Sequence, residues 1–144
     1  MDRNVGPKDA LLLDTHTWIW LLADSDQLAS VARQKIALAQ ADKRVFGSII
    51  SVLETANLES KGRIHLPTGI HSWLEESFAD DGIQLLPLSP EIAVASTRLP
   101  GTIHGDPADR ILIATARIHN LTLLTRDKQL LTYGRKGHVH VQSV

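Results

Sequence analysis

A short apolar run that ends at an acidic residue is the feature that most constrains the fold of this chain. Residues 10–13 read ALLL, and Asp14 follows them directly. An uninterrupted apolar run of this length is typical of a strand buried on both faces, as in a parallel sheet covered by helices. Further strands are predicted at 44–48, 83–87, 121–124 and 139–141.

The segments between these strands have the spacing of apolar residues that is typical of helices. Helices are predicted over 15–23, 28–41, 49–61, 67–78, 89–99 and 106–120, with a short helical turn over 128–132. Short strands that alternate with longer helices indicate an α/β fold. We therefore expect a three-layer α/β/α sandwich around a central, mostly parallel sheet.

The length of 144 residues is usual for one domain. We expect a single domain over 10–144, preceded by an N-terminal extension, 1–9, to which no role is assigned. The longest apolar runs, 18–23 and 111–114, are far shorter than the roughly 18 residues that span a bilayer. No membrane segment or secretory signal is expected, and the absence of cysteine is compatible with a cytoplasmic location.

Charge is distributed unevenly along the chain. The net charge is −1, but residues 1–109 carry −6 and residues 110–144 carry +5. The basic C-terminal quarter predicts either a surface that faces the phosphates of a nucleic acid or an ordinary solvated face.

Four acidic residues occupy related positions in the predicted fold. Asp14 closes the first strand, and Asp127 follows the fourth. Glu54 lies in the helix after the second strand, and Asp109 lies in the first turn of the helix at 106–120. Because ligands of open α/β sheets bind at the carboxyl ends of strands, we expect these side chains to converge.

Each acid also has a purely structural interpretation. Ser51 and Glu54 have the spacing of a capping box. In the segment DPAD, Asp106 suits the N-cap position, and Asp109 lies near the positive end of the helix dipole. Asp14 and Asp127 can each cap the helix or helical turn that follows. Capping alone accounts poorly for the whole set, because an uncompensated carboxylate at the end of a buried strand, as at Asp14, is costly.

Converging carboxylates predict a metal site. Three or four of them within about 4–6 Å repel one another and take up protons unless a cation neutralises them. Ligands that are all oxygen favour Mg²⁺ or Mn²⁺ over zinc. An ion held in this way can polarise a phosphodiester and activate water for in-line attack. The sequence therefore predicts metal-dependent phosphodiester hydrolysis.

Four segments resemble, in order and in spacing, the signature segments of PIN-domain ribonucleases, most closely the VapC-type toxins of bacterial toxin–antitoxin pairs. They read LLLDTHTWIWLL, SIISVLETANLESKGRI, HGDPADRILIATA and LTLLTRD. The resemblance implies a Mg²⁺- or Mn²⁺-dependent endoribonuclease that cuts single-stranded or structured RNA. It also implies that Asp14, Glu54, Asp109 and Asp127 are the catalytic, metal-binding acids.

The same resemblance implies two protein partners. One is a second copy of the chain in a homodimer. The other is a cognate antitoxin, a segment of which lies in a groove formed by the early helices. Trp18 and Trp20 are two residues apart on a predicted helix and so lie on different faces, which allows one of them to lie at an interface.

Several neighbours of the acids are candidates for supporting roles. Asp106 can share the metal with Asp109, cap the helix, or do both. His104, Arg110 and Arg126 are predicted to contact the RNA substrate, although the two arginines fit internal ion pairs equally well.

Other polar and aromatic residues carry weaker signals. The hydroxyls of Thr15, Ser48 and Thr125 can orient a water molecule or cap a helix. His138 and His140 have no further ligand nearby in the sequence, so no zinc site is expected. Because the chain has only six aromatic residues, a platform for stacking RNA bases is not expected either.

Alternative functions remain open at this stage. A PIN-type RNA-processing nuclease without an antitoxin has the same site. A phosphoryl-accepting signalling domain or a non-catalytic metal-binding α/β domain also presents carboxylates, but the signalling domain needs adjacent acids after the first strand. Here Asp14 is followed by Thr15 and His16, and DTHT likewise lacks the second aspartate of a haloacid-type phosphatase.

Overall fold

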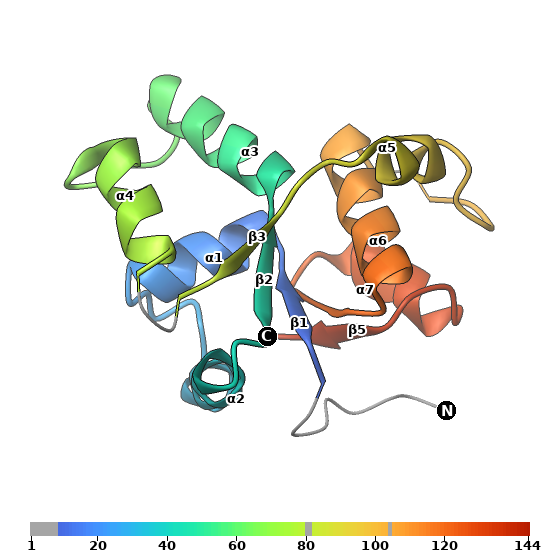
Figure 1. The fold of residues 1–144 in the computed structure, drawn as a ribbon, viewed down its shortest axis with the longest axis horizontal. Coiled ribbons are helices and arrows are strands. Elements are labelled where there is room, and N and C mark those ends of the chain that lie inside the picture. The colour runs from blue at the N-terminus through green and yellow to red at the C-terminus, as the bar shows by residue number, and fades with distance from the viewer. Residues whose placement is uncertain (1–8, 80–81, 104) are drawn as a thin grey trace.

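The computed structural model describes residues 9–79, 82–103 and 105–144, and its fold is built on one five-stranded sheet (Figure 1). In sheet order the strands are β3, β2, β1, β4 and β5, and all four pairings are parallel. The strands are β1 (Leu11–Leu13), β2 (Val45–Ser48), β3 (Gln84–Leu86), β4 (Thr122–Thr125) and β5 (Val141–Ser143).

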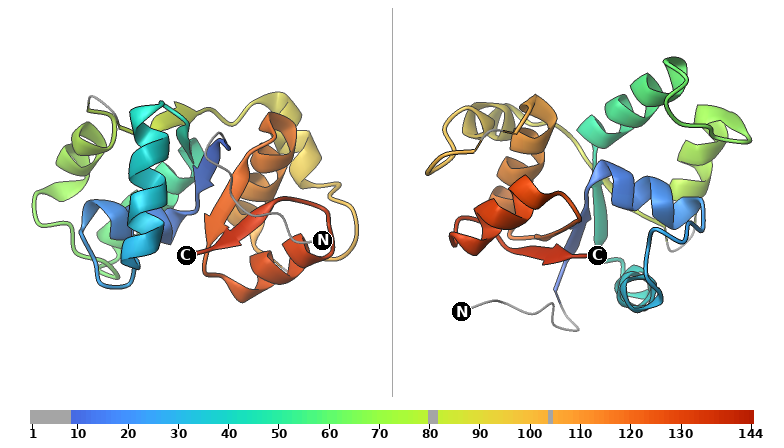
Figure 2. Two further views of the ribbon diagram at one scale, coloured as in Figure 1. Left: turned by 90° about the horizontal axis from the view of Figure 1, so that it is seen from below. Right: turned by 180° about the vertical axis from the view of Figure 1, so that it is seen from behind.

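Helices cover both faces of this sheet, which confirms the predicted three-layer α/β/α sandwich. Figure 2 shows the two helical layers from two further directions. α1, α2 and α4 lie on one face, α6 and α7 lie on the other with α5 packed on α6, and α3 contacts both α1 and α6. The helices are α1 (Thr15–Leu22), α2 (Ser30–Ala41), α3 (Ile49–Ser60), α4 (Gly69–Ser77), α5 (Pro90–Ser96), α6 (Pro107–His119) and α7 (Lys128–Arg135).

The apolar run of β1 is buried on both faces, as its sequence predicts. Leu11 and Leu13 join the core that lies under α1, α2 and α4, around Trp18. Leu12 points the other way, into the core under α6 and α7. Successive strand residues face opposite sides, so a strand between two helical layers needs apolar residues at every position.

Two local predictions are corrected by the structure. The last strand is Val141–Ser143 instead of 139–141, because β5 pairs with β4 in the register that places Val141 opposite Leu123. The proposed capping box at Ser51 is wrong. α3 begins three residues earlier than such a box requires, and Ser48 is its N-cap, accepting a hydrogen bond from the N–H of Ile50 at 3.1 Å.

The ends of the other helices agree only in part with the predicted ends. Gly62 follows α3 in a left-handed conformation, with φ of 71°, as expected of a residue just past a helix C-terminus. α7 is longer than the predicted turn, and α5 ends at Ser96, earlier than predicted. Within the described ranges, no helix is both long and apolar enough to span a bilayer. A single domain over 10–144 stays a prediction, and residues 1–8 of the extension lie outside the described residues.

Candidate active site

The candidate site lies at the carboxyl ends of β1 and β4, where the strand order reverses. Strands β2 and β3 extend the sheet on one side of β1, and β4 and β5 extend it on the other. Such a switch point leaves a crevice outside the strand ends, which is the usual ligand position in an open parallel sheet. Asp14 directly follows β1, and its N–H donates to Leu124 O of β4 at 3.1 Å.

A cleft of about 400 Å³ opens at this point, and five carboxylates from separate parts of the chain line it. Asp14 comes from the end of β1, Glu54 from α3, and Asp127 from the end of β4. Asp106 and Asp109 come from the start of α6. The remaining lining residues are Thr15, His16, Trp20, Leu112 and Arg126.

Asp14 is held rigidly by hydrogen bonds to both of its carboxylate oxygens. Oδ1 accepts from the N–H of Thr17 at 2.9 Å, so Asp14 is the N-cap of α1. Oδ2 accepts from the hydroxyl of Thr125 at 2.5 Å. Only 9% of Asp14 is exposed. Capping and cleft lining therefore coexist in this residue, and Thr125 orients the carboxylate.

Glu54 reaches across from α3 to α1 instead of capping its own helix. Its Oε1 accepts from the hydroxyl of Thr15 at 2.5 Å, and Thr15 is also hydrogen-bonded to the hydroxyl of Ser51 at 2.9 Å. Burial raises the pKa of Glu54, the bond from Thr15 opposes that rise, and the negative charge of Asp106 adds to it. This carboxyl thus holds a proton more readily than an exposed glutamate does.

Asp109 has the largest electrostatic perturbation in the cleft. Burial, followed by the charges of Asp106, Asp127 and Glu54, raises its pKa from 3.8 to about 7. Asp106 accepts from the N–H of Asp109 at 2.9 Å as the N-cap of α6. Three neighbouring carboxylates thus oppose ionisation of this residue.

Asp127 is the N-cap of α7 and accepts from the N–H groups of Gln129 and Leu130 at 2.8 and 3.1 Å. Its own N–H donates to the hydroxyl of Thr125, the residue that also bonds Asp14. Thr125 therefore links the carboxyl ends of the two central strands, and it positions two of the cleft's acids at once.

The donor set suits a hard divalent cation. Every acidic group in the cleft offers oxygen, and burial together with the neighbouring carboxylates raises the pKa of Asp109. Over the residues that the structure describes, no three His, Asp or Glu side chains are assembled as a ready ligand cluster. The chemistry of the residues fits a divalent ion, whereas a closed ligand cage is not formed.

The predicted substrate-contact residues differ in their positions. Arg126 lines the cleft. Arg110 does not, because its guanidinium donates to the carbonyls of Ile103 and Gly105 at 3.0 and 3.2 Å. Among the described residues neither arginine forms an ion pair with an acid. His104 lies outside the described residues.

Sequence reasoning missed two lining residues, His16 and Trp20. Both lie on α1, two and six residues after Asp14. Trp18 is fully buried in the core, whereas Trp20 is partly buried and reaches the cleft. The spacing of the two tryptophans places them on different faces of the helix. Since Trp18 faces the core, this spacing is the sequence signal that Trp20 faces elsewhere.

Residues 11–136 match the PIN domain family. Because this match covers most of the chain, the chain belongs to the PIN domain family, as its motifs predict. Within that family its kinship is with the VapC ribonucleases. It is 33% identical over 134 residues to Ribonuclease VapC22 of Mycobacterium tuberculosis, which covers 93% of this chain and 95% of that protein. Such ribonucleases generally depend on divalent metal ions.

Solved structures share the fold. VapBC2 from Rickettsia felis, bound to a DNA fragment from its promoter, superposes with a TM-score of 0.71 at 16% identity, over 94% of this chain and 98% of that one. A toxin–antitoxin complex from Klebsiella pneumoniae gives a TM-score of 0.57 at 25% identity, over 83% and 89% of the two chains.

Proposed function

We propose that this protein is an endoribonuclease that depends on Mg²⁺ or Mn²⁺ and acts as the toxin of a toxin–antitoxin pair. The observation that carries the proposal is the acidic cleft at the switch point of the sheet, in which burial and the neighbouring carboxylates raise the pKa of Asp109 to about 7. A cleft of this charge repels an RNA phosphate unless a cation lies between them. Kinship with a named VapC ribonuclease supports RNA as the substrate.

Each acid has a distinct role in this proposal. Asp14 and Asp109 hold the ion, and Glu54 and Asp127 complete the site. Asp106 mainly caps α6 and shares the ion only in part. A divalent ion bound here supplies Lewis-acid activation of the phosphodiester and of the attacking water.

The protein's own side chains prepare that chemistry. Thr17 and Thr125 fix the direction of the Asp14 carboxylate. Glu54 sits behind the hydroxyl of Thr15, and its raised pKa allows it to take a proton from water and to release it again.

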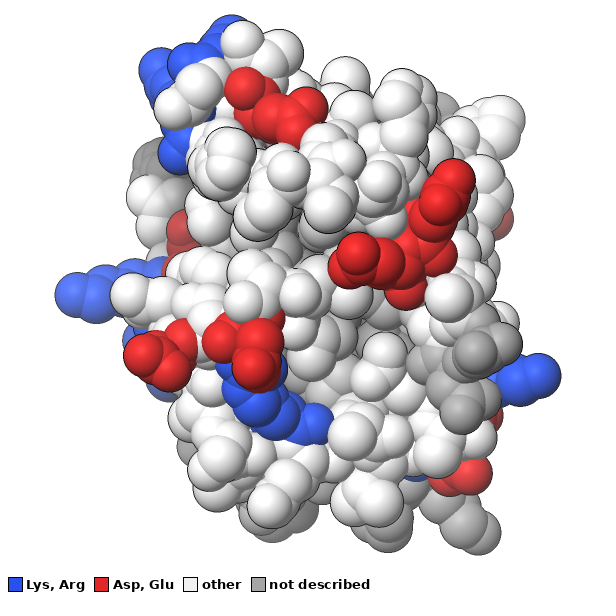
Figure 3. Space-filling model, turned by 90° about the vertical axis from the view of Figure 1, so that its left-hand side faces the viewer, with Lys and Arg blue, Asp and Glu red and all other residues white. Residues whose placement is uncertain are grey.

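The RNA backbone is proposed to run from the cleft toward α7. Lys128 directly follows Asp127, and Lys128 and Lys136 line a neighbouring pocket of about 210 Å³. The opposite side of the molecule, formed by α3 and α4, offers no comparable track. Among its described residues, acidic groups are separated by wide uncharged areas, and Lys and Arg lie at the rim or, in one place, against an acidic group within the face (Figure 3).

Two protein partners belong to the proposal, a second copy of the chain and a cognate antitoxin. The structural relatives are toxin–antitoxin complexes, which supports an antitoxin partner here. Several large apolar side chains on the helices are exposed and available for such contacts: Val31, Leu38, Leu53 and Val94. Because the proposed substrate is cellular RNA, the proposal places the protein in the cytoplasm.

The test is RNA cleavage by the purified chain and by Asp14→Asn, with Mg²⁺, with Mn²⁺ and with EDTA. Asparagine can still accept the hydrogen bond from Thr17, so the variant should fold, and it should lose about 100-fold or more of the cleavage rate. Asp42→Asn is the matched control. Asp42 is exposed and lies just before β2, at the other edge of the sheet.

Full cleavage by Asp14→Asn, or cleavage that persists in EDTA, contradicts the proposal. Cleavage that a co-expressed partner from a neighbouring gene does not suppress contradicts the toxin role and favours an RNA-processing nuclease.

A further inference from the structure

One wall of the acidic cleft is built from three side chains with delocalised π systems. The guanidinium carbon of Arg126 lies over the Trp20 ring, 4.7 Å from its centroid. The His16 ring lies 5.8 Å from Trp20, centroid to centroid, at an interplanar angle of 50°. All three residues line the cleft. We call His16, Trp20 and Arg126 the stacking wall.

The stacking wall is braced from behind by the loop between α1 and α2. Arg126 donates to the side-chain oxygen of Gln27 at 2.9 Å, to the backbone carbonyl of Gln27, and to Val144 O at 3.3 Å. These bonds hold the guanidinium in place over Trp20. The wall is therefore formed before any ligand arrives, which lowers the entropic cost of binding.

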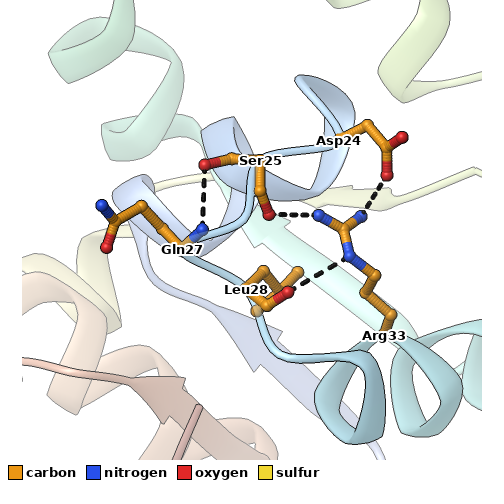
Figure 4. Close-up of polar contacts among 5 residues, drawn as sticks. All are labelled: Asp24, Ser25, Gln27, Leu28 and Arg33. Carbon is orange, nitrogen blue, oxygen red and sulfur yellow. Dashed lines mark hydrogen bonds and ion pairs between the residues drawn. The ribbon is translucent and has the colours of Figure 1, made fainter.

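The loop that carries Gln27 is itself fixed by Arg33 of α2 (Figure 4). Arg33 donates to Leu28 O at 3.2 Å and to Ser25 O, and it forms an ion pair with Asp24 at 2.9 Å. The N–H of Gln27 donates to the hydroxyl of Ser25 at 3.1 Å. A series of polar contacts thus connects α2 to the wall of the cleft.

The charge of the cleft limits what this wall can bind. Five carboxylates line the cleft, and Arg126 is the single Lys or Arg among its described lining residues. A phosphate gains little there from the protein alone. A nucleobase is uncharged and can stack on a histidine, tryptophan or arginine plane, which is the usual way in which proteins hold unpaired RNA bases.

We propose that the stacking wall binds one unpaired nucleobase, next to the phosphodiester that is cut, and that His16 is the residue on which the base stacks. The Arg126 guanidinium already lies over the Trp20 ring, whereas His16 is exposed. Trp20 supports the histidine through ring contact. This inference rests on the proposed function and extends it, because it makes the cleft selective for single-stranded RNA.

The test measures the affinity of a short single-stranded oligoribonucleotide by fluorescence anisotropy in the Asp109→Asn background, which prevents cleavage. One nucleotide at a time is replaced by an abasic ribose. At one position the loss of the base should weaken binding about tenfold. His16→Ala should weaken binding of the intact oligonucleotide by the same factor. It should not weaken binding of the abasic oligonucleotide any further, as expected when the side chain and the base contact each other directly.

Two further variants separate stacking from other roles of His16. His16→Phe keeps a flat ring and should restore the affinity. His71→Ala removes an exposed histidine of α4 that is outside the cleft lining and should have no effect. Trp18 and Trp73 are only 0% and 4% exposed, so quenching of tryptophan fluorescence by the oligonucleotide should come from Trp20.

The proposal is overturned if His16→Ala binds as tightly as the parent, if it weakens intact and abasic oligonucleotides equally, or if His16→Phe fails to restore binding. Failure of the proposed function gives a different result. If binding depends on the base and on His16 as described but the wild-type chain cuts no RNA, the stacking wall is supported and the proposed nuclease function is contradicted.

Discussion

Asp14 and Asp109 line the same cleft, yet their surroundings assign them different behaviour. Asp14 receives two hydrogen bonds, one on each oxygen, and these fix the direction of its carboxylate. Asp109 is buried beside negatively charged neighbours, and its pKa rises to about 7. The carboxyl group of Asp109 is thus expected to change its protonation near neutral pH.

The raised pKa of Asp109 predicts how stability depends on pH. Between its usual value of 3.8 and about 7, the folded metal-free chain holds a proton that the unfolded chain has released. The free energy of unfolding that this residue contributes is therefore present at low pH and falls as the pH rises through that window. Divalent ions should reverse the loss.

Thermal unfolding of the metal-free protein tests this expectation. We expect the Tm to be lower at about pH 8 than at about pH 5, and Asp109→Asn to reduce that difference. Mn²⁺ should raise the Tm more at the higher pH, where the carboxylate is ionised. An unchanged pH dependence in Asp109→Asn contradicts the assignment.

Gly105 lies close to the Asp109 side chain and leaves no room for a Cβ atom. A Cβ atom at residue 105 would lie 2.9 Å from Asp109 Cβ and 3.2 Å from its Oδ2. Gly105→Ala should therefore displace the carboxyl, lower the cleavage rate about tenfold or more, and leave the Tm nearly unchanged, because small misplacements of catalytic groups are costly. Cleavage at the wild-type rate would show that this close approach has no influence on the reaction.

At the scale of elements, helix starts deliver four of the five acids to the cleft. α1, α6 and α7 each begin with a capping aspartate whose side chain accepts a backbone N–H of the first turn. A cap must lie at the strand-to-helix or loop-to-helix junction, and in a parallel sheet these junctions gather at the carboxyl edge. The structural and the functional interpretations of these residues therefore describe one arrangement.

The packing of α1 on β2 depends on Gly47. A Cβ atom at this position would lie 2.5 to 2.9 Å from three ring atoms of Trp18, which is fully buried and donates to the hydroxyl of Ser77 at 2.9 Å. Gly47→Ala should lower the free energy of unfolding by about 1–3 kcal/mol, as expected of an overpacked core. Urea unfolding measures this change, and an unshifted midpoint would show that α1 moves away at no cost.

For the whole molecule, the charge distribution separates the acidic cleft, which is the proposed metal site, from the basic pocket proposed to contact phosphates. The acids gather in the cleft, whereas Lys128 and Lys136 line the pocket beside it. The basic C-terminal quarter of the sequence is therefore not a uniform surface. Arg110 is held by loop carbonyls, and Arg126 is held by the loop between α1 and α2.

The α7 lysines should account for part of the salt dependence of RNA binding. Each phosphate contact on a single strand contributes about 0.7 to the slope of log K against log salt, so Lys128→Ala with Lys136→Ala should reduce the slope by about 1.4. Lys35→Ala, on α2 in the opposite helical layer, serves as the control. Equal slopes for the parent and the double variant would show that these lysines of α7 do not contact the RNA phosphates.

Local patterns in the chain predicted the elements and their layering. The leucines of β1, the strand at 44–48 and the amphipathic helices are local signals, because burial on one or both faces sets the residue type at each position. The expected motifs also led to the PIN domain family. Helix ends were less predictable: α5 ends at Ser96 although the pattern predicts a helix to residue 99, and α7 extends to Arg135 although only a turn over 128–132 is predicted.

The composition of the cleft depended on the order of the strands in space. Asp14 and Asp127 become neighbours because β1 pairs with β4, a pairing between distant segments that no local pattern specifies. The same folding turns Trp20 and His16 into the cleft and draws Arg110 away from it. A local pattern records which face of an element is buried, whereas the identity of the facing side chains follows from contacts between segments far apart in the chain.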